Sequence, residues 1–279
     1  TEVDLMLFMG DLNMAGRGDK NDDITVSEGH AYEFRAVSDP TTLYPLTAGF
    51  GAAENREGGI DDGENKTGSL VPSFCEAYYA QTGIPVGGVD IAGWRSGNGI
   101  LEDAVNRLEA AKAFLAASET HSVRHIFAVW SHGETDAAEN VTAEDYQSGL
   151  RTVVRTLTRR GVEKCFLISC GSRTDAAAGV QTIRAAQEAL CGGMAEIVPV
   201  STAFSAIPDE LIAPDRYTQA GYRRVGANAG ENAGRWVLSP DGYEMLVIKP
   251  PVEERDDFDG DGIDLPEDSF RRLAARARA

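Results

Sequence analysis

Strand-like and helix-like runs alternate along most of this chain. Short runs of apolar and β-branched residues occur at 4–9, 88–91, 125–130, 165–169 and 196–200. Amphipathic stretches of helical length accompany them at 69–82, 100–118, 143–160, 176–190 and 218–237. Strands without polar alternation need cover on both faces, and strand–helix–strand repeats build parallel sheets. The sequence therefore predicts an α/β fold, a three-layer α/β/α sandwich around a parallel sheet.

Two regions interrupt this alternation. Residues 19–68 are rich in Gly, Asp, Asn and Glu, and we interpret them as an inserted loop region with a short strand at 30–37. After residue 237 the pattern stops, and we expect one extra strand at 242–249, then an acidic run and a short basic helix at 269–279. We therefore expect a main domain over residues 1–240 and a C-terminal extension over 241–279.

Composition excludes some partners. The 279 residues carry a formal charge of −18, which disfavours nucleic acid and anionic membranes because like charges repel. No apolar run approaches the ~20 residues that span a bilayer. The chain opens with Thr1-Glu2-Val3-Asp4 directly before a strand-like run, and no signal peptide is visible. These features predict a soluble protein without membrane insertion.

Three sequence blocks carry the chemically informative residues. The first strand-like run enters a turn that reads Gly10-Asp-Leu-Asn-Met-Ala-Gly-Arg-Gly18. The second block is Ala128-Val-Trp-Ser-His-Gly-Glu-Thr-Asp136, and the third is Asp215-Arg-Tyr-Thr-Gln-Ala-Gly-Tyr-Arg223. A weaker block, Gly93-Trp-Arg-Ser-Gly-Asn-Gly99, lies between the first two.

These blocks resemble the SGNH/GDSL hydrolases, in the branch of the sialate O-acetylesterase-like and acetylxylan esterases. The family patterns are Gly-Gln-Ser-Asn-Met-Ala-Gly-Arg, Trp-x-Gln-Gly-Glu-Ser-Asp and His-Tyr-Thr-x-x-Gly-Tyr-Arg, with an Asp three residues before the His. The resemblance extends from about residue 4 to residue 237 and implies a flavodoxin-like SGNH fold. The weaker block falls where the family places its oxyanion-hole glycine.

The family's catalytic roles are substituted in this sequence. Ester hydrolysis on this fold uses a Ser nucleophile, a His base, an Asp that orients the His, and a side-chain amide for the oxyanion. The matching positions hold Leu12, Arg216, Ala213 and His132. Leucine has no nucleophilic atom, and arginine stays protonated and cannot act as a base. The comparison therefore predicts a pseudoenzyme with no catalytic residues at these positions.

Two catalytic alternatives stay open. Ser131 or Ser96 could form a rewired dyad with His132, although adjacent strand residues point to opposite faces. Asp11 and Glu134 could work as a carboxylate pair of the kind that glycosidases use. A structural interpretation competes with both, because Asp and Asn suit turns and acids near a helix start stabilise it.

The resemblance implies that the degenerate site still binds a sugar, because family members act on acetylated carbohydrates. Trp94 could stack on a sugar ring, and polar side chains could bind its hydroxyl groups. The predicted ligand-binding residues are Asp11, Asn13, Arg17, Trp94, Arg95, Asn98, His132, Glu134 and Arg216.

The C-terminal extension contains an Asp-rich segment that resembles the calcium loops of thrombospondin type 3 and dockerin-like repeats. Alternate carboxylates can converge on one calcium ion while a glycine permits the sharp turn. The predicted ligands are Asp257, Asp259, Asp261, Asp264 and Asp268. Pro266 and the Asp at the last position depart from an EF-hand, and a solvated acidic linker is the competing interpretation.

The sequence thus favours a non-catalytic carbohydrate-binding or structural protein on an esterase-like fold. Its partners would be carbohydrate, such as an acetylated polysaccharide, and other subunits of an assembly such as a glycan-recognising spike of a phage-like particle. Possession of a calcium loop would favour an extracellular or particle-associated setting. The alternative is an active carbohydrate O-acetylesterase with rewired catalytic residues.

Overall fold

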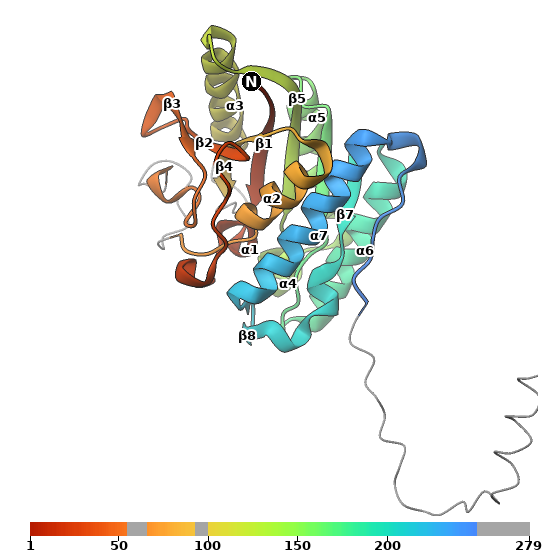
Figure 1. Cartoon of the computed structure of the whole chain (residues 1–279). Coiled ribbons are helices and arrows are strands. Elements are labelled where there is room, and N and C mark those ends of the chain that lie inside the picture. Colours follow the sequence, from red (N-terminus) through yellow and green to blue (C-terminus); the bar gives the residue numbers. More distant parts are fainter. Residues whose placement is uncertain (55–65, 93–99, 250–279) are drawn as a thin grey trace, which may run out of the picture.

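A mostly parallel sheet organises this computed structural model, which describes residues 1–54, 66–92 and 100–249 (Figure 1). The strands are β1 (Glu2–Gly10), β2 (Ala31–Arg35), β3 (Asp39–Pro45), β4 (Val86–Ala92), β5 (Ser122–Ser131), β6 (Lys164–Ile168), β7 (Ile197–Ser201), β8 (Leu211–Ala213) and β9 (Arg216–Tyr217). The first seven form one sheet in the order β3-β2-β4-β1-β5-β6-β7, in which only β3 runs antiparallel. β8 and β9 form a small antiparallel hairpin.

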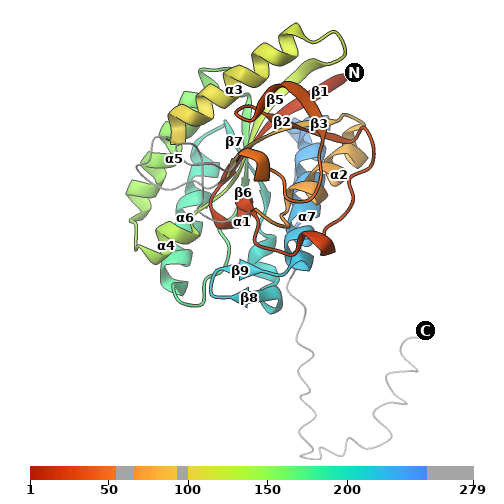
Figure 2. The same ribbon diagram turned by 90° about the vertical axis from the view of Figure 1, so that its left-hand side faces the viewer.

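Helices cover both faces of the sheet. They are α1 (Leu12–Ala15), α2 (Val71–Thr82), α3 (Ile100–Ala117), α4 (Glu134–Ala138), α5 (Ala143–Thr158), α6 (Ala177–Gly193) and α7 (Gln219–Leu238). Short 3-10 helices are η1 (Lys20–Asp22), η2 (Ala52–Glu54), η3 (Ala203–Ala206), η4 (Pro208–Glu210) and η5 (Pro240–Gly242). Helices α2 and α7 lie on one face, and α3, α5 and α6 lie on the other (Figure 2). The three-layer α/β fold predicted from the sequence is confirmed.

The central strand β1 explains why the apolar pattern predicted this fold. Leu5, Leu7 and Met9 pack into the core under α3, α5 and α6, whereas Met6 and Phe8 pack under α2 and α7. All five side chains are completely buried, because alternate residues of a strand point to opposite faces and both faces are covered. A polar residue at any of these positions would be buried without a partner.

Helices α2 and α7 approach each other closely through glycines. Gly226 and Gly230 lie one helical turn apart on α7 and face the backbone of α2. A Cβ atom at Gly226 would lie 2.2 Å from the carbonyl oxygen of Leu70, and one at Gly230 would lie 2.1 Å from that of Phe74. The Gly-rich sequence of α7 therefore sets the distance between two helices that carry one face of the core.

The region predicted as an inserted loop contributes to the sheet. Strand β2 pairs in parallel with β4, and β3 extends the edge as the antiparallel partner of β2. Only β2 was predicted, at residues 30–37. The main chains of Gly18 and Gly68 are bonded to each other, which closes the base of the insertion beside α1.

The extra strand predicted at residues 242–249 is not formed. This segment is extended, but its backbone binds the side chains of α7 and not a neighbouring strand. The N–H of Leu246 donates to Asn232 Oδ1 at 2.8 Å, and the carbonyl of Leu246 accepts from Asn228 Nδ2 at 2.8 Å and Asn232 Nδ2 at 3.0 Å. Side-chain amides on one helix thus replace the ladder that the apolar pattern suggested.

Among the described helices, none combines the length and apolar character that a bilayer crossing requires. The predicted calcium ligands in the C-terminal extension lie outside the described residues, as do Trp94, Arg95 and Asn98.

Candidate functional site

The first sequence block forms a tight turn at the carboxyl end of β1. Gly10 passes so close to β5 that a Cβ atom there would lie 1.8 Å from the carbonyl oxygen of Ser131. The N–H of Asp11 donates to that same oxygen at 3.3 Å, and α1 begins at the next residue, Leu12. A tight turn therefore leads from β1 into α1, and its partly buried leucine, Leu12, is the first residue of that helix.

A buried carboxyl group, that of Glu134, connects three strand ends and α7. Glu134 is the first residue of α4, and its Oε1 accepts hydrogen bonds from Asn13 Nδ2 at 2.9 Å and from the N–H of Gly171 at 2.5 Å. Asn13 Oδ1 in turn accepts from the hydroxyl group of Tyr222 at 2.9 Å. Residues that follow β1, β5 and β6 are thus joined in one hydrogen-bond network with α7.

Asp11 places a second buried carboxyl group beside Glu134. Asp11 Oδ2 accepts from the N–H of Thr135 at 3.3 Å. Asp11 Oδ1 and Glu134 Oε2 accept no hydrogen bond from an N–H or hydroxyl group of a described residue. A hydrogen bond between the two carboxyl groups contributes to the shifts of both pKa values. Burial is the main cause that raises the pKa of Glu134 to about 8, and the charge of Asp11 raises it further. Burial also raises the pKa of Asp11. At neutral pH, Glu134 therefore keeps its proton beside Asp11.

Both carboxyl groups of the Asp11–Glu134 pair are buried. Asp11 is 3% exposed and Glu134 is fully buried, and neither lines the hollow or the cavity described below. The two carboxyl groups therefore belong to the interior of the structure.

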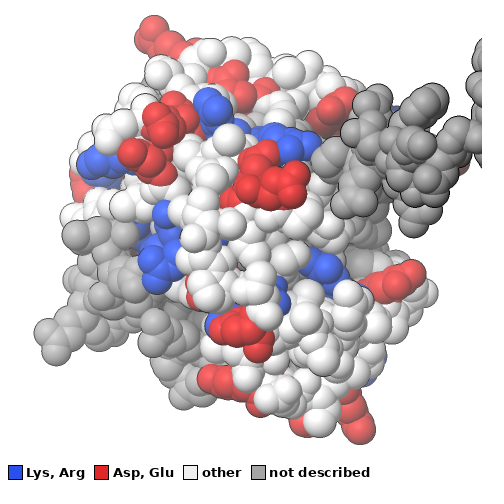
Figure 3. All heavy atoms as spheres, turned by 90° about the horizontal axis from the view of Figure 1, so that it is seen from below, with Lys and Arg blue, Asp and Glu red and all other residues white. Residues whose placement is uncertain are grey.

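A surface hollow of about 620 Å³ lies beside this network, at the carboxyl ends of the strands. We call it the arginine hollow, and it is lined by Arg17, Gly18, Asp19, Lys20, Asn21, Asp22, Thr67, Ile212, Arg216, Thr218 and Gln219. Three of these side chains are cationic and two are acidic, in a chain whose net charge is −18. Lys and Arg side chains accompany Asp and Glu on this face of the molecule (Figure 3).

The β8–β9 hairpin positions Arg216 at the arginine hollow. Ala213 pairs with Arg216 across the hairpin, and β9 lies against α1. The Arg216 side chain is 42% exposed, with Nε 3.7 Å from Asp215 Oδ1. Arg216 and Ala213 occupy the positions where the resemblance places a His and an Asp, so this hairpin presents a cation and a methyl group instead of a base and its partner.

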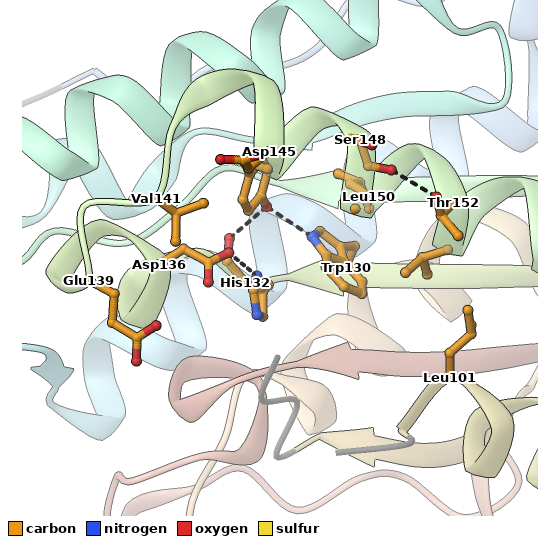
Figure 4. A pocket seen from close by; sticks show the side chains of 13 residues that line it. Leu101, Trp130, His132, Asp136, Glu139, Val141, Asp145, Ser148, Leu150 and Thr152 are labelled. Atoms are coloured by element: carbon orange, nitrogen blue, oxygen red, sulfur yellow. Dashed lines mark hydrogen bonds and ion pairs between the residues drawn. The ribbon is translucent and has the colours of Figure 1, made fainter. Parts of the chain in front are cut away.

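His132 lies in a different cavity, on the α5 side of the sheet (Figure 4). This His132 cavity has a volume of about 410 Å³ and lies between the start of α3, the end of β5, α4 and α5. The His132 ring is 5.0 Å from the ring of Trp130 and 6.0 Å from that of Tyr146. Burial lowers the pKa of His132, so its ring is neutral at pH 7.

The backbone carbonyl of His132 is held by two side-chain hydrogen bonds. The carbonyl oxygen of His132 accepts from the Tyr146 hydroxyl group at 3.2 Å and from Gln187 Nε2 at 2.9 Å. The Tyr146 oxygen also accepts from Trp130 Nε1 at 3.2 Å. No described hydroxyl or thiol group bonds to the His132 ring, and the buried Ser131 Oγ also has no partner among the described residues.

The structure thus divides the predicted ligand-binding residues into three groups. Asp11, Asn13 and Glu134 come together in the interior, Arg17 and Arg216 line the arginine hollow, and His132 faces a separate cavity. Sequence reasoning missed other lining residues. Thr218 and Gln219 lie within the third block, so their position in the sequence could have identified them as site residues. Lys20 and Asn21 adjoin the first block, but only their polarity marked them.

Within the described residues, no group of three or more His, Cys, Asp or Glu side chains is arranged to hold a metal ion. The predicted calcium loop lies beyond this part of the chain.

Comparisons with known proteins identify the fold. A protein of Arabidopsis thaliana superposes with a TM-score of 0.60 at 17% identity, over 86% of this chain and 99% of its own. NanS superposes with a TM-score of 0.56 at 12% identity, over 85% of this chain and 98% of its own. A G-D-S-L-family lipolytic protein from Desulfitobacterium hafniense matches 55% of this chain with a TM-score of 0.38.

Comparison of sequences does not assign the chain to a family. No protein-family model matches the chain, and no curated protein matches it. The chain therefore shares its fold with the Arabidopsis protein and NanS, at identities that speak to architecture alone.

Proposed function

We propose that this protein is a non-catalytic binding protein on an esterase-like SGNH fold, and that the arginine hollow binds carbohydrate. The proposal rests on which residues occupy the positions of a nucleophile and a base. Leu12 and Arg216 replace a nucleophile and a base, and His132, the one imidazole at the second block, faces another cavity. Acyl transfer requires a nucleophile and a base within hydrogen-bond reach.

The other imidazoles do not supply a base. The partner of His30 is Glu76, that of His121 is Thr120, and that of His125 is Glu163. His30 and His125 lie outside the arginine hollow and the His132 cavity, as does His121. The alternative, an active carbohydrate O-acetylesterase, would need the buried Ser131 and the ring of His132 to rearrange before they could interact.

The lining of the arginine hollow supports carbohydrate as the ligand. Sugar hydroxyl groups require both donors and acceptors, and the hollow offers guanidinium, ammonium, amide, hydroxyl and carboxylate groups together. The side chains come from the turn after α1, from η1, from Thr67, and from the β8–β9 hairpin and the start of α7. A surface or particle-borne module would use such a site to recognise a glycan.

Two measurements test this proposal. Incubation with p-nitrophenyl acetate and with acetylated xylan should release no acetate above the buffer rate. Turnover that His132→Ala abolishes would overturn the non-catalytic assignment.

Binding should be measured separately on a glycan array with wild type and Arg216→Ala. Arg160→Ala removes the same charge from the end of α5, where its side chain is 53% exposed, and serves as the control. We expect Arg216→Ala to weaken glycan binding and Arg160→Ala to leave it unchanged. Equal binding by all three proteins would remove the arginine hollow from consideration.

We also propose that the Asp-rich segment with Asp257, Asp259 and Asp261 binds calcium. Isothermal titration of calcium into the full chain should release or absorb heat with a stoichiometry of about one. A truncation after Lys249 is the matched control and should give none. A flat titration of the full chain at millimolar calcium would exclude the site.

A further inference from the structure

The His132 cavity contains an acidic group without a hydrogen-bonding partner. Asp136 lies on α4, its side chain is 14% exposed, and its carboxylate accepts no hydrogen bond from a described residue. Its Oδ2 lies 3.7 Å from His132 Nδ1, which is too long for a hydrogen bond. His132 is 5% exposed, and this buried nitrogen has no hydrogen-bonding partner among the described residues. A partly exposed carboxylate and a buried imidazole nitrogen thus lie side by side without a hydrogen bond between them.

The charged side chains in the described lining of the cavity are all acidic. Asp136, Glu139 and Asp145 line it, and no Lys or Arg belongs to its described lining. His132 does not offset them, because its lowered pKa leaves the ring neutral at pH 7. A mostly buried carboxylate that has no donor is unfavourable, and a ligand cation would relieve it.

The remaining lining is apolar and aromatic. Leu101, Val141 and Leu150 contribute aliphatic surface, and Trp130 contributes a ring (Figure 4). Tyr146 contributes a second ring. Aromatic rings near a carboxylate are favourable surroundings for an organic cation. The Tyr146 hydroxyl group already makes three hydrogen bonds, so the polar recognition falls to Asp136. A volume of about 410 Å³ is enough for a ligand of one ring and a short chain.

From this arrangement we infer that the His132 cavity binds a small organic ammonium ion with an apolar body. The ammonium group donates to the Asp136 carboxylate beside His132 Nδ1, and the apolar body lies against the aliphatic and aromatic lining. This site is separate from the arginine hollow, so the inference does not depend on the proposed carbohydrate binding.

Three probes of equal size test the inference by calorimetry on the full chain at physiological salt. Phenethylammonium carries the cation, 2-phenylethanol is its neutral counterpart, and phenylacetate carries the opposite charge. We expect phenethylammonium to bind at least about tenfold more tightly than the alcohol, because a hydrogen bond to a charged partner separates them. Phenylacetate should not bind. Equal affinity for the amine and the alcohol, or no binding of the amine at millimolar concentration, would overturn the inference.

Two variants localise the binding. Asp136→Asn should weaken phenethylammonium binding by roughly tenfold or more. Asp241→Asn removes the same charge from the exposed 3-10 helix η5 and should leave the affinity unchanged. Equal weakening by both variants would indicate general attraction to an acidic chain and would overturn the site. If Asp136→Asn does not fold, Glu139→Gln at the exposed rim should weaken binding by a smaller factor, and wild-type affinity in that variant would count against the site.

Discussion

Each end of β1 has a buried carboxyl group, and the two groups have opposite surroundings. Near the amino end, the carboxylate of Asp4 accepts from the Tyr78 hydroxyl group at 2.5 Å and from two nitrogens of Arg124, at 2.9 Å and 2.5 Å. Just past the carboxyl end, Asp11 accepts one backbone hydrogen bond at 3.3 Å and lies beside a second buried acid, Glu134. One carboxylate is paired with a cation, and the other is placed next to a group of its own kind.

This difference changes how the two carboxyl groups respond to pH. A buried charge with a well-placed cationic partner is tolerated, whereas two adjacent buried carboxyl groups are stable only while one keeps its proton. Parallel α/β folds place their binding sites at the carboxyl ends of the strands. The pair of acids thus lies at the end of the sheet where such folds bind ligands, and the paired Asp4 lies at the other end.

The pair makes the folded state sensitive to pH. An ionised aspartate has no proton to donate to an ionised glutamate, so Asp11 cannot stabilise the charged form of Glu134. The raised pKa of Glu134 therefore couples folding to proton binding.

The largest expected effect is on the pH dependence of unfolding. The pKa of Glu134 is about 8 in the folded protein and 4.5 in the absence of the fold. Its contribution to stability is therefore full below pH 4.5 and is lost as the pH rises to about 8, with a slope of about 1.4 kcal/mol per pH unit. Urea unfolding of wild type and Glu134→Gln over this range measures it, and the variant should be the more stable protein at pH 8.

The amide of Glu134→Gln keeps an oxygen for Asn13 and Gly171 and presents an N–H₂ group toward Asp11. The exposed Glu163→Gln is the control and should follow wild type. Parallel pH profiles for wild type and Glu134→Gln would show that Glu134 is ionised in the fold and would remove the contrast between the two ends of β1.

A smaller effect, of opposite sign, is expected at the amino end. Asp4→Asn removes the charge that Arg124 and Tyr78 bind, and the free energy of unfolding should fall by about 3 kcal/mol. The loss is at the low end for a broken buried pair, because the Arg124 side chain is 25% exposed and can turn to water. Urea unfolding at pH 7 measures it, with Asp241→Asn as the exposed control. A stability equal to that of wild type would mean that the two ends do not differ.

Much of the fold was predictable from sequence, because buried parallel strands and amphipathic helices leave strong local patterns. The strand expected at residues 4–9 and the helix expected at 100–118 match β1 and α3 within two residues at each end. The segment at 242–249 misled because its binding to Asn228 and Asn232 is a tertiary contact that no local pattern records. β3 was missed because its sequence is polar and it lies at the sheet edge.

The sequence predicted which residues of the site lie close together, but it did not predict where their side chains point. The first two blocks placed Asp11, Asn13 and Glu134 at neighbouring strand ends, and the structure brings them together. Proximity along the blocks did not reveal that Arg216 faces outward while His132 turns toward α5. That division depends on packing against helices far away in the sequence, and it decides which residues share a ligand.

The smallest expected effect distinguishes the two causes of the raised pKa of Glu134. Asp11→Asn keeps an oxygen for the Thr135 N–H and places an amide donor toward Glu134, so it removes the like charge but leaves the burial unchanged. Because burial is the larger cause, the pKa of Glu134 should fall only part of the way, and stability at pH 8 should rise by about 1 kcal/mol, less than in Glu134→Gln. The urea series that compares wild type with Glu134→Gln measures it when extended to this variant. If Asp11→Asn abolishes the whole pH dependence, the charge of Asp11 and not burial is the main cause of the raised pKa of Glu134. The carboxyl end of β1 would then differ from the amino end only because no arginine pairs with its carboxyl groups.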